Sequence, residues 1–330
     1  MKTILFGFAA LSLVTVPTSA TAQSDSSSSS SQSGSLLDVK LPDGVTSADL
    51  DKRDVQMVAV QVMLDRSRFS PGVIDGYSGG NTNRAIRAYR QAHGLGGGSG
   101  VDRELLQSLL DTQGGDVFRT YQITAEDVNY DFTDVPSGFE AKAKLDRLNY
   151  GSPLEMLAER FHMDQDFLRA LNPDADFSRA GTTINIVSHG DNELGSSVAK
   201  IEVRKRENAV VALDEAGKVL ASYPATIGSD QFPSPNGDMT VNAVAPEANY
   251  TFTPEGREWG PDETLVIAAG PNNPVGGVWI DLSKEGYGIH GSPDPQLIGK
   301  TSSHGCVRLT NWDARELAGA VSQGVPVVFL

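Results

Sequence analysis

The chain has 330 residues, of which 39% are hydrophobic and 21% charged, and its formal net charge at pH 7 is −15. This length predicts two or three domains with ordinary globular cores. The acidic balance excludes a nucleic-acid-binding protein, because a phosphate-binding surface needs clustered Lys and Arg.

Residues 1–22 have the pattern of an export signal. Lys2 gives the positive start, residues 4–16 form a short apolar core, and Ala20-Thr21-Ala22 fits a small-residue cleavage site. The apolar run is too short for a membrane span, and no other segment has the length of a transmembrane helix. We therefore expect a protein without a transmembrane segment that is exported and lies in the periplasm or is associated with the cell wall.

A tether and a helical module are expected next. Residues 23–44 begin with a run of Ser, Gln and Gly that cannot bury enough apolar surface to fold, which predicts a flexible tether. Residues 45–112 show three stretches of helical periodicity separated by glycine-rich turns, and Asp102 is placed to cap the last one. In the first stretch, a stripe of Asp54, Gln61 and Asp65 predicts a helix with one solvated face.

The motifs of this helical module resemble the peptidoglycan-binding domain 1 family. The order is Pro71-Gly-Val-Ile-Asp-Gly, Thr82-x-x-Ala-Ile, then Tyr89-Arg-Gln. The resemblance implies a module that binds the cell wall.

Residues 113–142 are turn-rich and are predicted to be a linker, and residues 143–190 form a small α+β unit. Ser152 with Glu155 predicts a capped helix that carries proline at its first position, and Asp164 caps a second one. Leu157-Ala-Glu-Arg-Phe and Leu171-Asn-Pro resemble a LysM carbohydrate-binding repeat, so the unit either binds glycan or braces the next domain. His162 and His189 are isolated in the sequence, which favours solvated or structural roles.

Residues 198–330 change to a β pattern. Short alternating runs separated by turns predict a mostly-β sandwich or partly closed barrel. One helix is expected at about residues 312–322, with Thr310 or Asn311 as its cap. An insert at about residues 245–260, rich in Pro, Asn and aromatics, is predicted to form a lid. The fold class is therefore multidomain: an all-α module, an α+β unit and a mostly-β domain.

The segment at residues 287–309 contains the chemistry. Cys306 is the only cysteine of the chain, and exported proteins usually hold cysteines in disulfide pairs. A single thiol there favours a chemical role over that of a small buried residue. Ser303-His304-Gly305-Cys306 has the composition of a turn, in which glycine leaves backbone N–H groups facing an oxyanion. His290 closes a strand-like run and is placed to act as the base that takes the thiol proton.

This segment resembles the catalytic signature of the L,D-transpeptidases, the YkuD-like family. Ile289-His290-Gly291 precedes a loop and then Ser303-His304-Gly305-Cys306-Val307-Arg308. The resemblance extends over residues 198–330 and implies an acyl transfer on peptidoglycan stem peptides. On this resemblance, Cys306 is expected to form a thioester with release of D-alanine, and the amine of a second stem is expected to resolve it to a 3→3 cross-link.

Roles for the neighbouring residues follow in part from that resemblance. The Gly291 carbonyl orients His290, and the backbone N–H groups of Gly305 and Cys306 hold the oxyanion. Ser303 and His304 order the nucleophile turn. Arg308 lies on the face of Cys306 if the strand continues, where it is expected to bind an anionic group of the substrate. Peptidoglycan peptides and glycan are the expected partners, carbapenem-type β-lactams the expected inhibitors, and no cofactor or metal is expected.

Other interpretations remain. A metal site built from His290, Asp294 and His304 is disfavoured, because two prolines prevent a helix there and Cys306 would go unused. The same pocket could admit water or an anchored protein, which would give an L,D-carboxypeptidase or an enzyme that attaches or detaches a wall-bound protein. A non-catalytic peptidoglycan-binding protein is the alternative from another class. The acyl acceptor, the diamino acid, lid motion and oligomeric state are not determined by the sequence.

Overall fold

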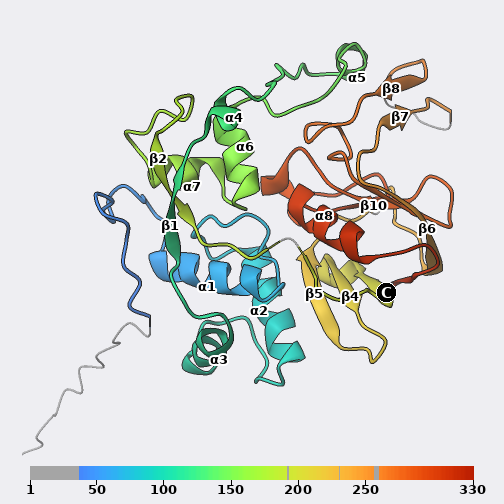
Figure 1. Cartoon of the computed structure of the whole chain (residues 1–330). Coiled ribbons are helices and arrows are strands. Elements are labelled where there is room, and N and C mark those ends of the chain that lie inside the picture. The colour runs from blue at the N-terminus through green and yellow to red at the C-terminus, as the bar shows by residue number, and fades with distance from the viewer. Residues whose placement is uncertain (1–36, 192, 230, 256–259) are drawn as a thin grey trace, which may run out of the picture. The chain divides into compact units, whose positions relative to one another are not determined.

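The computed structural model describes residues 37–191, 193–229, 231–255 and 260–330, which belong to one compact unit (Figure 1). The predicted export signal, residues 1–22, and the first part of the predicted tether, residues 23–36, lie outside the described residues. No helix within the described ranges has the length and apolar character needed to cross a membrane.

Three helices form the predicted N-terminal module: α1 (Val55–Arg66), α2 (Gly80–Ala92) and α3 (Arg103–Gln113). The side chains of Asp54 and Asp102 cap α1 and α3 by accepting backbone N–H groups. Their shared core includes Leu64, Ile86, Tyr89, Leu105 and Leu109.

The predicted solvated face of α1 is wrong, because Gln61 and Asp65 are only 1% and 8% exposed. Gln61 donates to the Asp75 carboxylate and accepts the Gly76 N–H, both at 2.8 Å. Asp65 accepts the Gly190 N–H at 2.7 Å. Loops distant in sequence therefore replace the water that a polar stripe was expected to contact.

The stretch predicted as linker contains structure. β1 (Phe118–Gln122) pairs antiparallel with β2 (Thr183–Val187), so the α+β unit begins before residue 143. Two short helices follow β1, namely α4 (Ala125–Val128) and α5 (Phe139–Lys142). The polar side chains of β1 are mostly exposed, which explains why no hydrophobic alternation revealed it.

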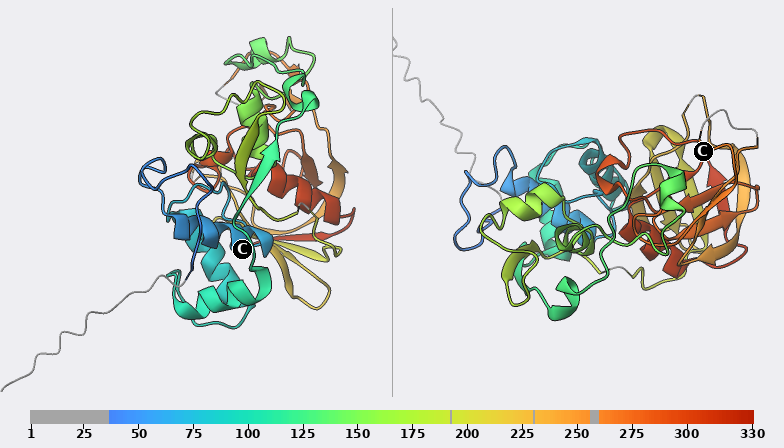
Figure 2. Two further views of the ribbon diagram at one scale, coloured as in Figure 1. Left: turned by 60° about the vertical axis from the view of Figure 1, so that its left-hand side comes forward. Right: turned by 90° about the horizontal axis from the view of Figure 1, so that it is seen from above.

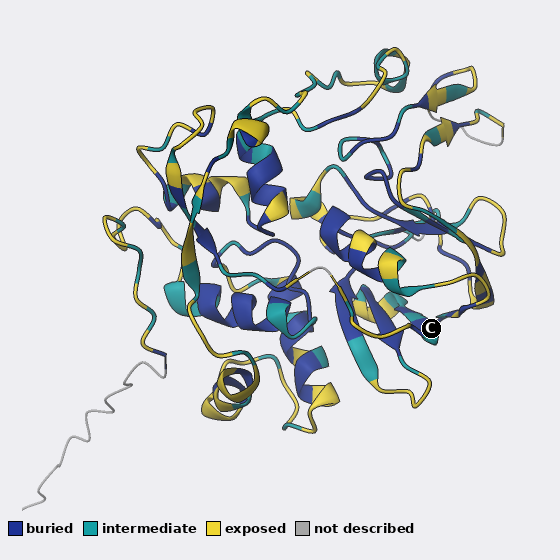
Figure 3. Cartoon of the chain, viewed as in Figure 1, coloured by how far each residue is buried: buried dark blue, intermediate teal, exposed yellow. Residues whose placement is uncertain are grey.

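The two helices of the α+β unit are α6 (Pro153–Arg160) and α7 (Gln165–Ala170). Ser152 and Asp164 cap them as predicted. One hydrophobic core joins this unit to the N-terminal module: Val58, Val62 and Ile74 pack in the same cluster as α6, α7 and β2. Figure 3 shows the buried residues that run through α1 and α6. The two predicted modules are therefore not independent packing units.

The C-terminal part is built on an eight-stranded sheet in the order β11-β10-β9-β6-β12-β3-β4-β5. All its strand pairs are antiparallel except β10–β11 and β12–β3. The strands are β3 (Lys200–Arg204), β4 (Ala209–Leu213), β5 (Val219–Pro224), β6 (Gly237–Ala245), β9 (Trp279–Leu282), β10 (Gly288–His290), β11 (Val307–Arg308) and β12 (Pro326–Phe329). The mostly-β prediction is confirmed, as one continuous sheet rather than two packed sheets.

One α-helix covers this sheet, as predicted. α8 (Asn311–Ala320) is capped by Thr310 and lies along the sheet (Figure 2). Its Ala314 and Leu317 belong to the sheet's hydrophobic core. Short 3₁₀ turns lie at Lys205–Glu207 and Pro295–Leu297. The predicted lid region contains β7 (Tyr250–Phe252), which pairs with β8 (Leu265–Ile267) in a separate two-stranded sheet, while residues 256–259 lie outside the described ranges.

The N-terminal part docks on the edge strand β5. Ser222 donates to the Arg68 carbonyl and accepts from the Ser70 N–H, both at 2.9 Å. The Asn81 side chain also donates to the Ile298 carbonyl at 2.8 Å. Main-chain hydrogen bonds thus attach the N-terminal part to the sheet that carries the predicted nucleophile.

Candidate active site

A cavity of about 1300 Å³ contains most of the predicted site residues. Its lining includes Cys306, His290, Ser303, His304 and Arg308. Gly291 and Gly305 are not among the lining residues, and their backbones form hydrogen bonds with His290 and Ser303. The other walls come from Phe139, Gln231, Phe232, Ala245, Glu247, Ala248, Asn249, Tyr250, Thr251, Thr253, Pro274, Val275, Trp279 and Gly286.

Two short parallel strands aim the functional side chains into this cavity. Ile289 of β10 pairs with Val307 of β11, and both side chains are fully buried in the core. Because side chains alternate along a strand, the paired His290 and Arg308 point to the opposite side. Cys306 precedes β11 by one residue and lines the cavity with them.

His290 is held as a neutral ring. Its Nδ1 lies 2.7 Å from the Gly291 carbonyl oxygen, which can only accept, so Nδ1 carries the proton and Nε2 is the acceptor. Trp279 stacks on the ring, with 5.4 Å between centroids and 21° between planes. Burial, and then the charge of Arg308, lower the pKa of His290 to about 3.

The turn before Cys306 is fixed by two serines. Ser303 Oγ donates to the Cys306 carbonyl at 2.5 Å and accepts the Gly305 N–H at 3.1 Å. The buried Ser234 donates to the Gly305 carbonyl at 2.6 Å. The half-buried Cys306 thiol donates to the Gly286 carbonyl at 3.5 Å. The Gly305 N–H, predicted as an oxyanion donor, thus donates to Ser303 Oγ in this structure, and its role toward an oxyanion stays a prediction.

Glycine is required at both predicted positions. Gly305 has a φ of +118°, and a Cβ there would lie 3.1 Å from the Tyr287 ring. A Cβ at Gly291 would lie 2.2 Å from Asn311 Oδ1. Gly305 is thus required by its backbone conformation, and Gly291 by the lack of space for a Cβ.

His304 and Arg308 differ in their surroundings. His304 is exposed, and its ring lies 4.8 Å from that of Phe232. Arg308 is half-buried; among the described residues its Nε has no hydrogen-bond partner and no acidic side chain forms an ion pair with it. The guanidinium therefore brings a positive charge to the cavity wall that the described part of the protein does not neutralise.

Several residues of the site were missed by the motif. Ser234 lies in the proline- and glycine-containing run Pro233-Ser-Pro-Asn-Gly, and Trp279 lies at the start of β9. Nothing in the sequence indicated that Phe139 of α5 would line the cavity. Its ring stacks on Tyr250 and Phe252 of β7, with centroids 5.8 and 5.3 Å away. The stretch predicted as linker therefore supplies part of the cavity wall beside the predicted lid.

Two other sets of side chains carry atoms of the kind that bind metals. Asp65, His162 and His189 place one ligand atom each within 4.8 Å of one another, the one such group among the described residues. Asp65 is already bonded there, to His162 Nδ1 at 3.0 Å and the Gly190 N–H at 2.7 Å. His290, Asp294 and His304 form no such group in the described ranges.

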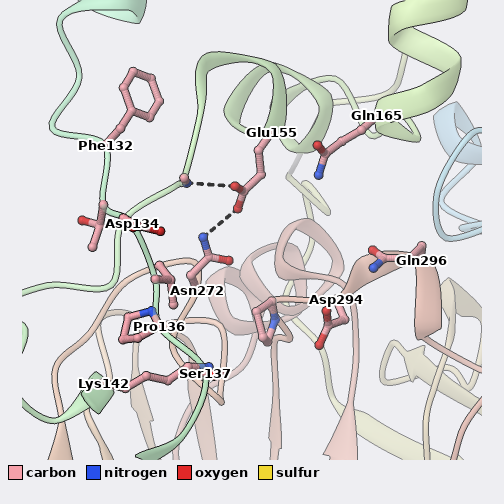
Figure 4. A pocket seen from close by; sticks show the side chains of 14 residues that line it. Phe132, Asp134, Pro136, Ser137, Lys142, Glu155, Gln165, Asn272, Asp294 and Gln296 are labelled. Atoms are coloured by element: carbon pink, nitrogen blue, oxygen red, sulfur yellow. Dashed lines mark hydrogen bonds between the residues drawn. The ribbon is translucent and has the colours of Figure 1, made fainter.

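A second cavity of about 690 Å³ lies where α6, the segment before α5 and the loop after β10 meet (Figure 4). Its lining is polar, and across it Glu155 accepts a hydrogen bond from the Asn272 side chain at 2.7 Å. No residue of the predicted catalytic signature lines it.

Comparison with known proteins identifies the domain that carries the main cavity. The family model of the L,D-transpeptidase catalytic domain, YkuD, matches residues 199–329. The YkuD protein of Bacillus licheniformis is 27% identical over 54% of this chain and 93% of its own length. That of Bacillus subtilis is 49% identical over 33% of this chain and 53% of its own. YbiS of Escherichia coli is 30% identical over 54% and 60%.

All three relatives carry names that assign them as L,D-transpeptidases. This chain spans only about half to three fifths of the length of the last two. A solved L,D-transpeptidase from Mycobacterium smegmatis aligns with 44% of this chain and 63% of its own at 20% identity, with a TM-score of 0.34, which is too low to add to the argument. On the sequence matches, residues 199–329 form an L,D-transpeptidase catalytic domain of the YkuD family.

Proposed function

We propose that the chain cross-links peptidoglycan stem peptides by acyl transfer through Cys306. The observation that carries this proposal is the neutral His290 ring, whose Nε2 is an acceptor in the cavity that Cys306 lines. Because the pKa of His290 is lowered to about 3, the ring is unprotonated near neutral pH, the state that a general base needs before proton transfer.

The reaction has two balanced steps. Cys306 Sγ bonds to the peptide carbonyl carbon that follows the L-configured centre of the stem's diamino acid, and its proton passes to His290 Nε2. The C–N bond to D-alanine breaks, and His290 returns that proton to the leaving amine. An amine of a second stem then attacks the thioester, its proton passes through His290, and the thiol is restored. The product is a 3→3 cross-link.

The surroundings of Cys306 divide the remaining roles. The Cys306 N–H is the proposed oxyanion donor, a contribution of about 3–4 kcal/mol per donor. Ser303 and Ser234 hold the turn from either side of Gly305. Arg308, without an acidic partner in the described ranges, is proposed to bind a carboxylate of the stem peptide.

Incubation of the protein with isolated sacculi, followed by mass spectrometry of the released muropeptides, tests the reaction. New 3→3 dimers with loss of D-alanine are the expected product. Tripeptides trimmed of D-alanine without dimers would instead indicate an L,D-carboxypeptidase. Release or capture of a wall-bound protein would indicate an enzyme that attaches or detaches such proteins.

Carbapenems are the proposed inhibitors, because their strained amide is a substitute for the scissile peptide bond. One acyl mass should appear on the Cys306 peptide, and Cys306→Ala, which replaces a small residue by a small one, should remove it. A reduced wild-type thiol that never acquires the adduct would refute the acyl-transfer mechanism.

The N-terminal part is proposed to bind peptidoglycan, and the protein to act in the periplasm or at the cell wall. The motifs of residues 45–112 and 143–190 support this proposal. The full chain should be used to test it, since these residues share one core. Cys306→Ala protein should co-sediment with purified sacculi across a range of salt. Protein that stays in the supernatant would limit these residues to a structural role.

A further inference from the structure

Asn311 is fully buried at the start of α8, and both the oxygen and the nitrogen of its carboxamide form hydrogen bonds. Its Oδ1 accepts the Ser292 N–H at 2.9 Å. Its Nδ2 donates to Glu159 Oε2 at 2.8 Å and to the Pro271 carbonyl at 3.1 Å. The side chain thus connects the loop after β10 to helix α6, which lies outside the family match.

The Ser292 N–H belongs to the same peptide group as the Gly291 carbonyl. That carbonyl accepts from His290 Nδ1 at 2.7 Å. The orientation of this one peptide group therefore depends on Asn311 at its N–H end and fixes the imidazole at its C=O end. A hydrogen bond received at the N–H also strengthens the carbonyl as an acceptor.

Glu159 and the Pro271 carbonyl together determine which way round the Asn311 carboxamide lies. An ionised carboxylate only accepts, so Asn311 must present its NH₂ group to Glu159 and its oxygen to Ser292. Glu159 is itself buried, 7% exposed, and its Oε1 accepts from Tyr150 at 2.7 Å and from both terminal nitrogens of Arg315 at 3.2 Å. Both of its oxygens are thus occupied by donors.

We propose that Glu159 is a positioning residue for the catalytic base His290, acting through Asn311 and the Gly291–Ser292 peptide. This inference rests on the proposed role of His290. Figure 1 shows α6 beside the start of α8, and the two helices are in direct contact. The α+β unit is accordingly part of the catalytic apparatus, whether or not it binds glycan.

Glu159→Gln is the sharp test, because it keeps the shape of the side chain. A carboxamide has one accepting end, whereas Glu159 faces donors on both sides. If the oxygen of the new carboxamide faces Arg315, its NH₂ group opposes that of Asn311, and the Asn311 carboxamide is pushed out of its present position against the Ser292 N–H. We expect the maximal acylation rate with a carbapenem to fall about 10-fold, since small displacements of reacting groups cost up to ~10²-fold, with unchanged half-saturation.

Glu155→Gln is the matched control. Glu155 lies one turn earlier on α6 and crosses the same junction to Asn272, with no contact to the His290 peptide (Figure 4). It should acylate at the wild-type rate. A rescue variant completes the design: Arg315→Met added to Glu159→Gln removes the group that demands an acceptor. The oxygen of the introduced carboxamide is then able to face Asn311, and most of the rate should return.

The outcomes separate cleanly. A wild-type protein that is not acylated refutes the proposed function itself. An acylated wild type with Glu159→Gln equally fast, or with Glu155→Gln equally slow, refutes the positioning role. If Glu159→Gln is unstable, the ¹⁵N-labelled His290 Nδ1–H signal of Asn311→Ala decides: a signal unchanged from that of the wild type would overturn the proposal.

Discussion

Two buried histidines, His290 and His162, have different roles because their hydrogen-bond partners and neighbouring charges differ. His290 and His162 are 4% and 3% exposed, and each stacks on a tryptophan, Trp279 at 5.4 Å and Trp312 at 5.0 Å. His290 donates to a carbonyl, lies near the positive Arg308 and faces a large cavity. His162 is bonded to the Asp65 carboxylate, where α1, the α+β unit and α8 meet.

The difference lies in charge rather than in burial. Burial and the Arg308 guanidinium keep the His290 ring neutral, and the Gly291 carbonyl, by accepting the Nδ1 proton, leaves Nε2 as the acceptor. At the other site, burial would raise the pKa of Asp65, but the imidazole of His162 and the Gly190 N–H outweigh it and lower that pKa. The carboxylate holds the ring in place, so this pair serves packing between the parts of the chain.

The largest effect should come from removing the base. His290→Ala should slow acylation of Cys306 by ~10²–10⁴-fold, the contribution typical of a lost general base. Mass spectrometry of the adduct over time measures it. Raising the pH should partly restore the variant, because hydroxide ionises the thiol directly; a rate that stays at the wild-type level at pH 7 would remove His290 from the mechanism.

The depressed pKa of His290 should also appear in stability. The unfolded chain binds a proton near pH 6.5, whereas the folded chain binds it only near pH 3, so the free energy of unfolding falls as pH drops through this window. Relative to His290→Asn, the wild type should lose roughly 2–3 kcal/mol between pH 7 and pH 4.5, at ~1.36 kcal/mol per unit. Urea titrations of both proteins measure this difference, and parallel curves would contradict the lowered pKa.

At the pair of Asp65 and His162, a substitution is expected to lower stability without slowing acylation. Asp65→Asn should lower the free energy of unfolding by about 1.5–3 kcal/mol, the range for a hydrogen bond to a charged group. The carbapenem acylation rate of the folded variant should be unchanged, because Asp65 does not line the catalytic cavity. Denaturant unfolding and adduct kinetics on one preparation test both halves, and a slowed adduct with intact stability would reverse the assignment.

Arg308→Lys should give the smallest effect. It keeps the positive charge near His290 but loses the planar fork that binds a carboxylate in two places. We expect kcat/KM for a stem tetrapeptide to fall by about 10-fold, or ~1.4 kcal/mol, with an unchanged melting temperature. A lower melting temperature with full activity would instead indicate a structural ion pair.

Local patterns in the sequence were sufficient for the main helices and for the mostly-β character of the C-terminal part, and they singled out Cys306 and His290, which line one cavity. Helix caps such as Asp102 and Thr310 depend on residues a few positions away in the chain. The same holds for the short strands β10 and β11, which contain signature residues. Their periodicity and turn chemistry are therefore readable from the chain.

What the sequence did not reveal depends on contacts between distant segments. The polar stripe of α1 is buried because loops at Asp75 and Gly190 reach it. Phe139 enters the cavity wall only because α5 lies against β7, and Glu159 reaches Asn311 only because α6 docks on α8. The Gly305 N–H is occupied by Ser303, a detail of turn geometry that composition alone cannot specify.

Strand β12 has a consequence for how the chain folds. It lies in the middle of the sheet, where Val327 pairs with Ile201 of β3 on one side and Met239 of β6 on the other. Yet it follows every other strand of that sheet in the sequence. While the chain is being synthesised, β3 and β6 therefore present unpaired edges, which invite pairing with other chains. Closing the sheet requires contacts across more than a hundred residues, so we expect slow folding that gains from chaperone protection until β12 has been made.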